Sequence, residues 1–155
     1  MKKLILSVLL IPAVFSAQQT VSRDAEIANY VSQVSADSLK SHINKLVSFG
    51  TRHTMSSTTD AKKGIGAARN WVLSKFKNYA KNTDGRMEVF LQSQTIQPDG
   101  KRINQPTDLG NAIAILRGTD PNDKRIFMIG GHLDSRVSDV MNAKDFAPGA
   151  NDDGS

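Results

Sequence analysis

Apolar residues recur at helical spacing in two stretches near the start of the chain, residues 23–34 and 36–49. In the second stretch the recurring apolar residues are Leu39, Ile43, Leu46 and Val47. Asp37 can cap the start of this helix, and Gly50 follows its end. The pattern therefore predicts a helical lead-in over residues 18–50.

A third helical pattern follows the polar loop at residues 51–60, whose residues 57–60 are N-cap candidates. Its apolar positions are Ile65, Ala68, Trp71, Val72, Phe76 and Tyr79. Gly64 and Gly66 allow close backbone approach, as where a helix packs on a sheet. Because Trp71 and Phe76 lie on the apolar stripe, we interpret them as core residues.

Three strand candidates come next, at residues 87–96, 111–118 and 125–131, and the last two are apolar runs of strand length. The last two are separated by TDPND, a turn-forming cluster at residues 119–123. A helix followed by short apolar strands favours a sheet domain of the α/β or α+β class.

The first residues have the layout of a secretory signal peptide. Lys2 and Lys3 precede an apolar run at residues 4–15, and small and polar residues follow. This run is too short for a comfortable membrane span. Cleavage after Ser16 or after Ala17 fits equally well, so we expect residues 1–17 to be removed and the protein to be secreted or periplasmic.

Charge and cysteine content narrow the function classes. Loss of Lys2 and Lys3 with the signal lowers the formal net charge from +5 to +3, a mild excess interleaved with acidic residues. We therefore expect no nucleic-acid partner and, after cleavage, no membrane partner. Cysteine is absent from the chain, so stability must come from a core or a metal.

His132 and Asp134 are the first candidate site residues, because they follow the apolar run at 125–131. Residues two apart in an extended segment project to the same side, so the Asp134 carboxylate can lie beside the His132 ring. A metal-bound histidine commonly gives its other ring N–H to a carboxylate. The alternative is a solvated histidine beside an aspartate in a turn.

The second candidate is PGANDDGS, residues 148–155, in which Pro148 and Gly149 set a bend before Asp152 and Asp153. Carboxylates crowded into a segment with little side-chain bulk indicate a metal-binding loop. An exposed turn or a calcium loop would use the same residue types.

GGHLDSR at 130–136 and APGANDDGS at 147–155 together resemble the metal-site signature of the M28 family of zinc metallopeptidases, the di-zinc aminopeptidases. Residues 46–72 resemble the segment that precedes the sheet in exported bacterial members. The likeness covers about residues 35–155.

The resemblance implies a fold and a set of roles. The fold would be a mixed-sheet, three-layer α/β/α zinc-exopeptidase domain of the phosphorylase/hydrolase-like kind, with residues 51–155 as its N-terminal half. His132 would bind one of two zinc ions, Asp134 would orient His132, and Asp152 would bridge both ions. The family also implies a cis peptide bond between Asp152 and Asp153.

The chain departs from the family in lacking its later site residues: a general-base Glu with an adjacent Glu ligand, another Asp and a final His. Glutamate occurs only at Glu26 and Glu88. His42 lies in a helical pattern and His53 in a polar loop, where it and Arg52 could contact substrate or cap the next helix. The resemblance thus implies the incomplete front part of an enzyme, inactive by itself.

Three functions follow from these residues. The first is a secreted zinc exopeptidase, an aminopeptidase acting on peptides or proteins by means of a metal-activated water. The second is a single-zinc glutaminyl cyclase, although such enzymes pair Asp with Ser where this chain has Asp152 and Asp153. The third is a non-catalytic, truncated binding module.

Overall fold

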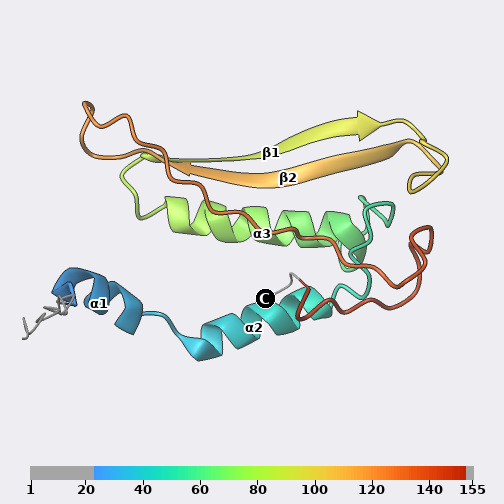
Figure 1. Cartoon of the computed structure of the whole chain (residues 1–155), viewed down its shortest axis with the longest axis horizontal. Coiled ribbons are helices and arrows are strands. Elements are labelled where there is room, and N and C mark those ends of the chain that lie inside the picture. The colour runs from blue at the N-terminus through green and yellow to red at the C-terminus, as the bar shows by residue number, and fades with distance from the viewer. Residues whose placement is uncertain (1–22, 153–155) are drawn as a thin grey trace, which may run out of the picture. The chain divides into compact units, whose positions relative to one another are not determined.

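The computed structural model describes residues 23–152, in which three helices precede two strands (Figure 1). The elements are α1 Ala25–Ser32, α2 Ala36–Val47, α3 Gly64–Ala80, β1 Met87–Ile96 and β2 Thr107–Leu116. None of the helices within residues 23–152 is long and apolar enough to cross a membrane. The predicted signal peptide lies outside the described residues.

Helix α1 belongs to a separate unit, residues 1–35, and α2 packs with the rest of the chain in the unit of residues 36–155. Asp24 caps α1, because its Oδ1 accepts hydrogen bonds from the N–H groups of Glu26 at 2.8 Å and Ile27 at 3.2 Å. The helical pattern predicted over residues 23–34 is thus confirmed.

Helix α2 is also confirmed, but the cap predicted for it is wrong. The helix begins at Ala36, so Asp37 lies inside the first turn. There its negative charge interacts favourably with the positive end of the helix dipole. Gly50 follows the helix with a φ of +80°, a left-handed conformation that glycine adopts without a Cβ penalty.

Helix α3 starts in a different way from the one predicted, since none of residues 57–60 caps it with a side chain. Ser56 Oγ accepts from the N–H of Ile65 at 2.9 Å instead, and the Ser57 carbonyl accepts from the N–H of Gly66 at 3.0 Å. The loop folds back over the first helical turn. Close backbone approach at Gly66 is therefore to Thr58 of this loop, rather than to a sheet.

The core of the larger unit lies between α2, α3 and the segment at residue 133. Phe49, Ala67 and Ala68 are buried there, with Leu46, Trp71 and Leu133 packed around them. The Trp71 ring contacts the rings of Phe49 and His42, with centroid separations of 6.3 Å and 5.5 Å. Trp71 is thus a core residue, as predicted, and His42 has a packing role.

Strands β1 and β2 form an antiparallel hairpin, in register from Met87 opposite Leu116 to Ile96 opposite Thr107. Helix α3 packs against both strands, as Figure 1 shows. In the connecting loop, Asp99 accepts hydrogen bonds from the N–H groups of residues 103, 101 and 102, and these bonds lower the pKa of its carboxyl to about 2.

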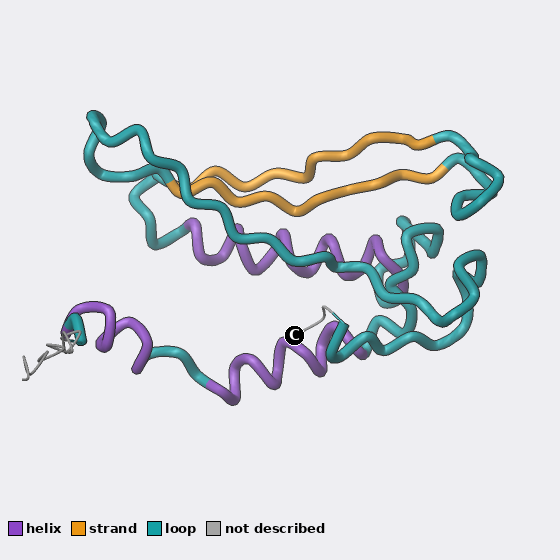
Figure 2. Tube along the Cα trace, in the orientation of Figure 1, coloured by secondary structure: helices purple, strands orange, loops and turns teal. Residues whose placement is uncertain are grey.

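The mixed α/β class is confirmed, whereas the third predicted strand, residues 125–131, is wrong for this structure. The segment is drawn as a loop after β2 in Figure 2. Within residues 23–152 the sheet has two strands, and a strand needs a partner for its backbone hydrogen bonds. The apolar residues of the 125–131 segment are 84–100% exposed: Ile126, Phe127, Met128 and Ile129. The three-layer architecture stays a prediction.

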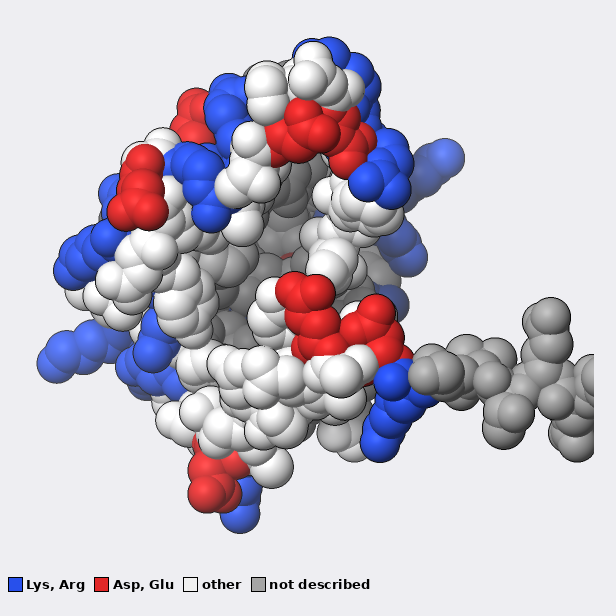
Figure 3. Space-filling view, turned by 90° about the vertical axis from the view of Figure 1, so that its left-hand side faces the viewer, with Lys and Arg blue, Asp and Glu red and all other residues white. Residues whose placement is uncertain are grey.

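Charged side chains of both signs intermingle on the face shown in Figure 3. Among the ion pairs, Arg125 Nη2 lies 2.6 Å from Asp123 Oδ2, and Arg117 Nη2 lies 3.7 Å from Glu88 Oε2. Exposed ion pairs of this kind contribute at most about 1 kcal/mol to the free energy of unfolding. The expectation that the protein has no nucleic-acid partner remains a prediction.

Candidate metal centre

His132, Leu133 and Asp134 lie on an irregular segment outside the helices and strands. Leu133 packs against the core, while His132 and Asp134 approach each other outside it. His132 Nδ1 is 3.1 Å from Asp134 Oδ1 and 3.1 Å from the Asp134 carbonyl oxygen. This is the local pairing that the His-x-Asp spacing predicted.

Asp152 reaches the other side of the same imidazole from a loop 20 residues further along the chain. Its Oδ1 lies 3.2 Å from His132 Nε2. The side chains of His132, Asp134 and Asp152 are 47%, 44% and 92% exposed. The structure thus brings all three predicted site residues together at a surface that a ligand can reach.

A carboxylate at each ring nitrogen has an electrostatic consequence. A neutral imidazole carries one N–H, so only one of the two nitrogens can donate to its carboxylate. With Nδ1 donating to Asp134, the lone pair of Nε2 would face the anionic oxygen of Asp152. A proton or a metal cation is needed between them.

The separation of Nε2 and Oδ1 fits a shared zinc ion. Zinc binds nitrogen and oxygen ligands at about 2.0–2.2 Å in tetrahedral geometry, which places two ligand atoms about 3.3 Å apart. The observed 3.2 Å between His132 Nε2 and Asp152 Oδ1 is close to that value. His132 and Asp152 can therefore serve as ligands of one ion.

These two residues do not complete a metal site. Within residues 23–152, no three His, Cys, Asp or Glu side chains come together in a way that could hold a metal ion. Catalytic zinc sites use three protein ligands. Asp153, and with it the cis peptide bond predicted between Asp152 and Asp153, lies outside the described residues.

A cleft of about 390 Å³ is lined by His132, Asp134 and Asp152. Residues 135–138 and Gly149 complete its lining. This volume lies within the range of small-ligand pockets. A small ligand could therefore bind directly against the predicted ligand atoms.

Arg52, which sequence reasoning left out of the site, is the main connector of the loops that carry these residues. Its side chain is fully buried. It donates to the carbonyls of Leu133 at 2.8 Å, Pro148 at 2.8 Å and Gly149 at 3.1 Å. Burial lowers the pKa of the Arg52 guanidinium, and the charge of Asp134 opposes that shift.

His53 is buried and structural in this arrangement. Its Nδ1 accepts a hydrogen bond from the N–H of Met55 at 3.0 Å, so Nε2 carries the proton and faces the Val140 carbonyl at 3.1 Å. With both ring nitrogens occupied, His53 is not available as a metal ligand here. It ties the polar loop to the segment that follows the site.

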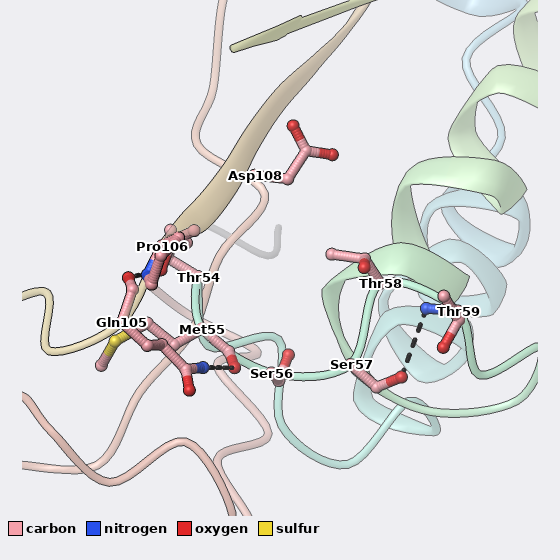
Figure 4. A pocket seen from close by; sticks show the side chains of 10 residues that line it. Thr54, Met55, Ser56, Ser57, Thr58, Thr59, Gln105, Pro106 and Asp108 are labelled. Carbon is pink, nitrogen blue, oxygen red and sulfur yellow. Dashed lines mark hydrogen bonds between the residues drawn. The ribbon is translucent and has the colours of Figure 1, made fainter. Parts of the chain in front are cut away.

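A second pocket, of about 340 Å³, lies between the loop at residues 54–59 and residues 105–108, and Figure 4 shows its hydroxyl-rich lining. The Gln105 side chain crosses it to the Met55 carbonyl, at 3.5 Å. Thr54 lines this pocket and also donates to Asp134 Oδ2 at 3.3 Å. The pocket thus connects to the His132 site through one hydrogen bond.

The chain is similar to fungal proteins named probable zinc metalloproteases. It is 45% identical over 132 residues to one from Leptosphaeria maculans and 43% identical over 132 residues to one from Pyricularia oryzae. Each match covers 85% of this chain but only 30% and 26% of the relative. The chain thus spans less than a third of the length of these relatives.

A more distant likeness is to leucine aminopeptidase 1 of Grosmannia clavigera, 30% identical over 135 residues, or 87% of this chain and 29% of that protein. No model of a protein family matches the chain, and no solved structure matches it. The resemblance to the M28 family therefore remains a prediction.

Proposed function

We propose that this chain forms part of a secreted zinc-dependent exopeptidase, an aminopeptidase, in which His132 and Asp152 hold zinc and Asp134 orients His132. The observation that carries the proposal is the pair of contacts at one imidazole, 3.1 Å from Nδ1 to Asp134 and 3.2 Å from Nε2 to Asp152. The arrangement leaves Nε2 and the Asp152 carboxylate to share one cation.

The relatives support the same function at a coarser level. Proteins similar over 85% of this chain are named zinc metalloproteases, which supports zinc and peptide or protein substrates. The likeness to a leucine aminopeptidase supports action at an amino terminus. A second zinc ion, bridged by Asp152, rests on the M28 resemblance, and export rests on the predicted signal peptide.

Zinc, when bound, polarises a peptide carbonyl and lowers the pKa of a bound water to about 7. The residues of this chain would hold the zinc ion and balance its charge. With its Nδ1–H donating a hydrogen bond to the Asp134 carboxylate, His132 would present the Nε2 lone pair to the metal, and the hydrogen bond would strengthen His132 as a ligand. The Asp152 carboxylate supplies negative charge that offsets the cation.

None of the described residues that line the cleft is a glutamate that could act as general base. The nearest candidates by type, Glu26 and Glu88, lie on α1 and β1. Glu88 pairs with Arg117 and does not line the cleft at His132, and Glu26 belongs to the separate unit of α1. We infer that the base and the remaining ligands belong to residues outside this chain, and that the chain alone is inactive.

Chelation tests the proposal in the full-length protein encoded by the gene. We expect hydrolysis of amino-terminal residues from peptides to disappear with 1,10-phenanthroline and to return with added zinc. Hydrolysis that survives removal of the metal would refute the proposal. Cyclisation of peptides with an amino-terminal glutamine, without hydrolysis, would favour the glutaminyl cyclase instead.

Asp134→Asn should weaken zinc binding roughly 10- to 100-fold, the usual effect of losing a carboxylate that orients a histidine ligand. Asparagine keeps the shape of the side chain but not its charge, so the basicity of His132 falls. Competition with a chromophoric chelator measures the affinity.

Asp139→Asn is the matched control for Asp134→Asn. Asp139 lies on the same segment and accepts a hydrogen bond from the N–H of Met141 at 2.9 Å, which asparagine can also accept. The control loses the same charge and should bind zinc like the parent protein. Equal affinities in the two variants would mean that Asp134 does not orient a ligand.

A further inference from the structure

The Arg52 guanidinium lies between two segments that each carry a predicted ligand. On one side, Nε donates to the Leu133 carbonyl at 2.8 Å. On the other side, Nη1 donates to Pro148 at 2.8 Å and Nη2 to Gly149 at 3.1 Å. Leu133 is the residue between His132 and Asp134, and Gly149 is three residues before Asp152.

The backbone of Arg52 reinforces the same junction. Its N–H donates to Ser135 Oγ at 3.1 Å, and that hydroxyl donates to the Ala147 carbonyl at 2.7 Å. Gly149 has a φ of +53°, and a Cβ there would lie 2.5 Å from Ser135 Cβ and 2.9 Å from Arg52 Nη2. The two segments are therefore packed tightly around the arginine.

We propose that Arg52 is a positioning residue for the metal site, whose guanidinium fixes the separation of His132 and Asp152 by holding the carbonyls on either side of it. The inference rests on the proposed function, because it assigns Arg52 a role in that same site. Arginine suits the role because its planar fork presents five donors in fixed directions, whereas lysine presents three donors from one nitrogen.

A purely structural role is the competing explanation, because any buried arginine that loses its partners destabilises a fold. Arg69 provides the matched comparison within the chain. It is 4% exposed, and its Nη2 donates to the carbonyl of Asp108, on β2, at 2.8 Å. Arg69 is thus a buried arginine that binds a backbone carbonyl, but neither it nor Asp108 lines the cleft at His132.

The experiment compares Arg52→Lys with Arg69→Lys in the full-length protein, measuring zinc affinity by competition with a chelator and Tm without metal. We expect both variants to lower Tm, and only Arg52→Lys to weaken zinc binding, roughly 10- to 100-fold. A loss of zinc affinity that is equal in the two variants, or absent in Arg52→Lys, would overturn the proposal.

Ser135→Ala covers the case in which Arg52→Lys does not fold, since it removes the hydroxyl that joins Arg52 to Ala147 but keeps the guanidinium. We expect a smaller loss of zinc affinity, roughly 3- to 10-fold, because part of the junction remains. Unchanged affinity in Ser135→Ala would count against the proposal in that case.

Metal-free crystal structures separate this proposal from the proposed function. If the parent protein binds no zinc, the proposed function fails, and the distance from His132 Nε2 to Asp152 Oδ1 decides the role of Arg52. A distance longer than the 3.2 Å seen here, in Arg52→Lys or in Ser135→Ala, supports positioning. The same distance in the variants overturns it.

Discussion

His132→Ala should lower kcat/KM of the full-length protein on peptide substrates by at least about a thousandfold, or about 4 kcal/mol of transition-state stabilisation. His132 is the only residue in the described part of the chain that faces both Asp134 and Asp152, at 3.1 Å and 3.2 Å. Its loss removes a predicted ligand and leaves two carboxylates with no group between them. Steady-state kinetics with zinc in excess measures the effect.

His42→Ala is the control for this experiment. His42 lies on α2, and its ring packs edge-to-face with the Trp71 ring, with the two ring centroids 5.5 Å apart. This contact belongs to the core rather than to the cleft. We expect its kcat/KM to stay within about twofold of the parent value once folded protein is compared, because it touches no predicted ligand. If His132→Ala were as active as His42→Ala, His132 could not be a zinc ligand.

Gly66→Ala should destabilise the protein by about 2–3 kcal/mol, although alanine normally stabilises a helix interior by about 1 kcal/mol relative to glycine. A Cβ on Gly66 would clash with the backbone carbonyl of Thr58. The loop would have to move, breaking the hydrogen bond from the Gly66 N–H to Ser57. Denaturant unfolding monitored by circular dichroism gives the free energy.

Asn70→Ala is the comparison for Gly66→Ala, because Asn70 is an exposed residue of the same helix. Alanine there should leave stability unchanged or raise it by about 0.5 kcal/mol through helix propensity. A Gly66→Ala protein as stable as Asn70→Ala would show that the loop at residues 57–59 does not pack on α3 as described.

Local patterns predicted the regular elements well. All three helices and the hairpin strands could be found from apolar spacing, which is a local property of the sequence. The spacing does not by itself show burial, since Ile27, Tyr30 and Val31 of α1 are 58–61% exposed. Strand β1 has the predicted bounds, whereas β2 begins at Thr107, four residues before the predicted run. Polar residues such as Asp108 pair in the ladder without contributing to an apolar pattern.

The predictions that failed depend on partners that are remote in sequence or that the pattern does not reveal. The apolar run at residues 125–131 has strand composition, but composition cannot provide the neighbouring strand that makes a ladder. The N-cap candidates that the sequence offers for α3 are residues 57–60, whereas Ser56 supplies the side-chain acceptor. A backbone turn, whose geometry is not encoded in residue type alone, decides which hydroxyl faces the helix.

In the site, too, contacts within one short segment were predictable, whereas contacts with residues remote in sequence were not. The pairing of His132 with Asp134 was predictable because both residues lie in one short segment, and the likeness of PGANDDGS to a metal loop pointed to Asp152. Arg52 was not predictable, since its carbonyl partners have no distinctive side chain. The one signal available was a cation in a polar loop without an acidic neighbour in sequence.

The contacts of Arg52 also bear on the order in which the chain is expected to fold. They join residues 81, 96 and 97 positions apart, whereas the helices and the hairpin close over short distances. Closing long loops has an entropic cost that must be met before the contacts form, so long-range pairings are slow. During synthesis, Arg52 emerges well before Gly149. We therefore expect the Arg52 junction, like the packing of Leu133 against Phe49, to form after the helices and the hairpin.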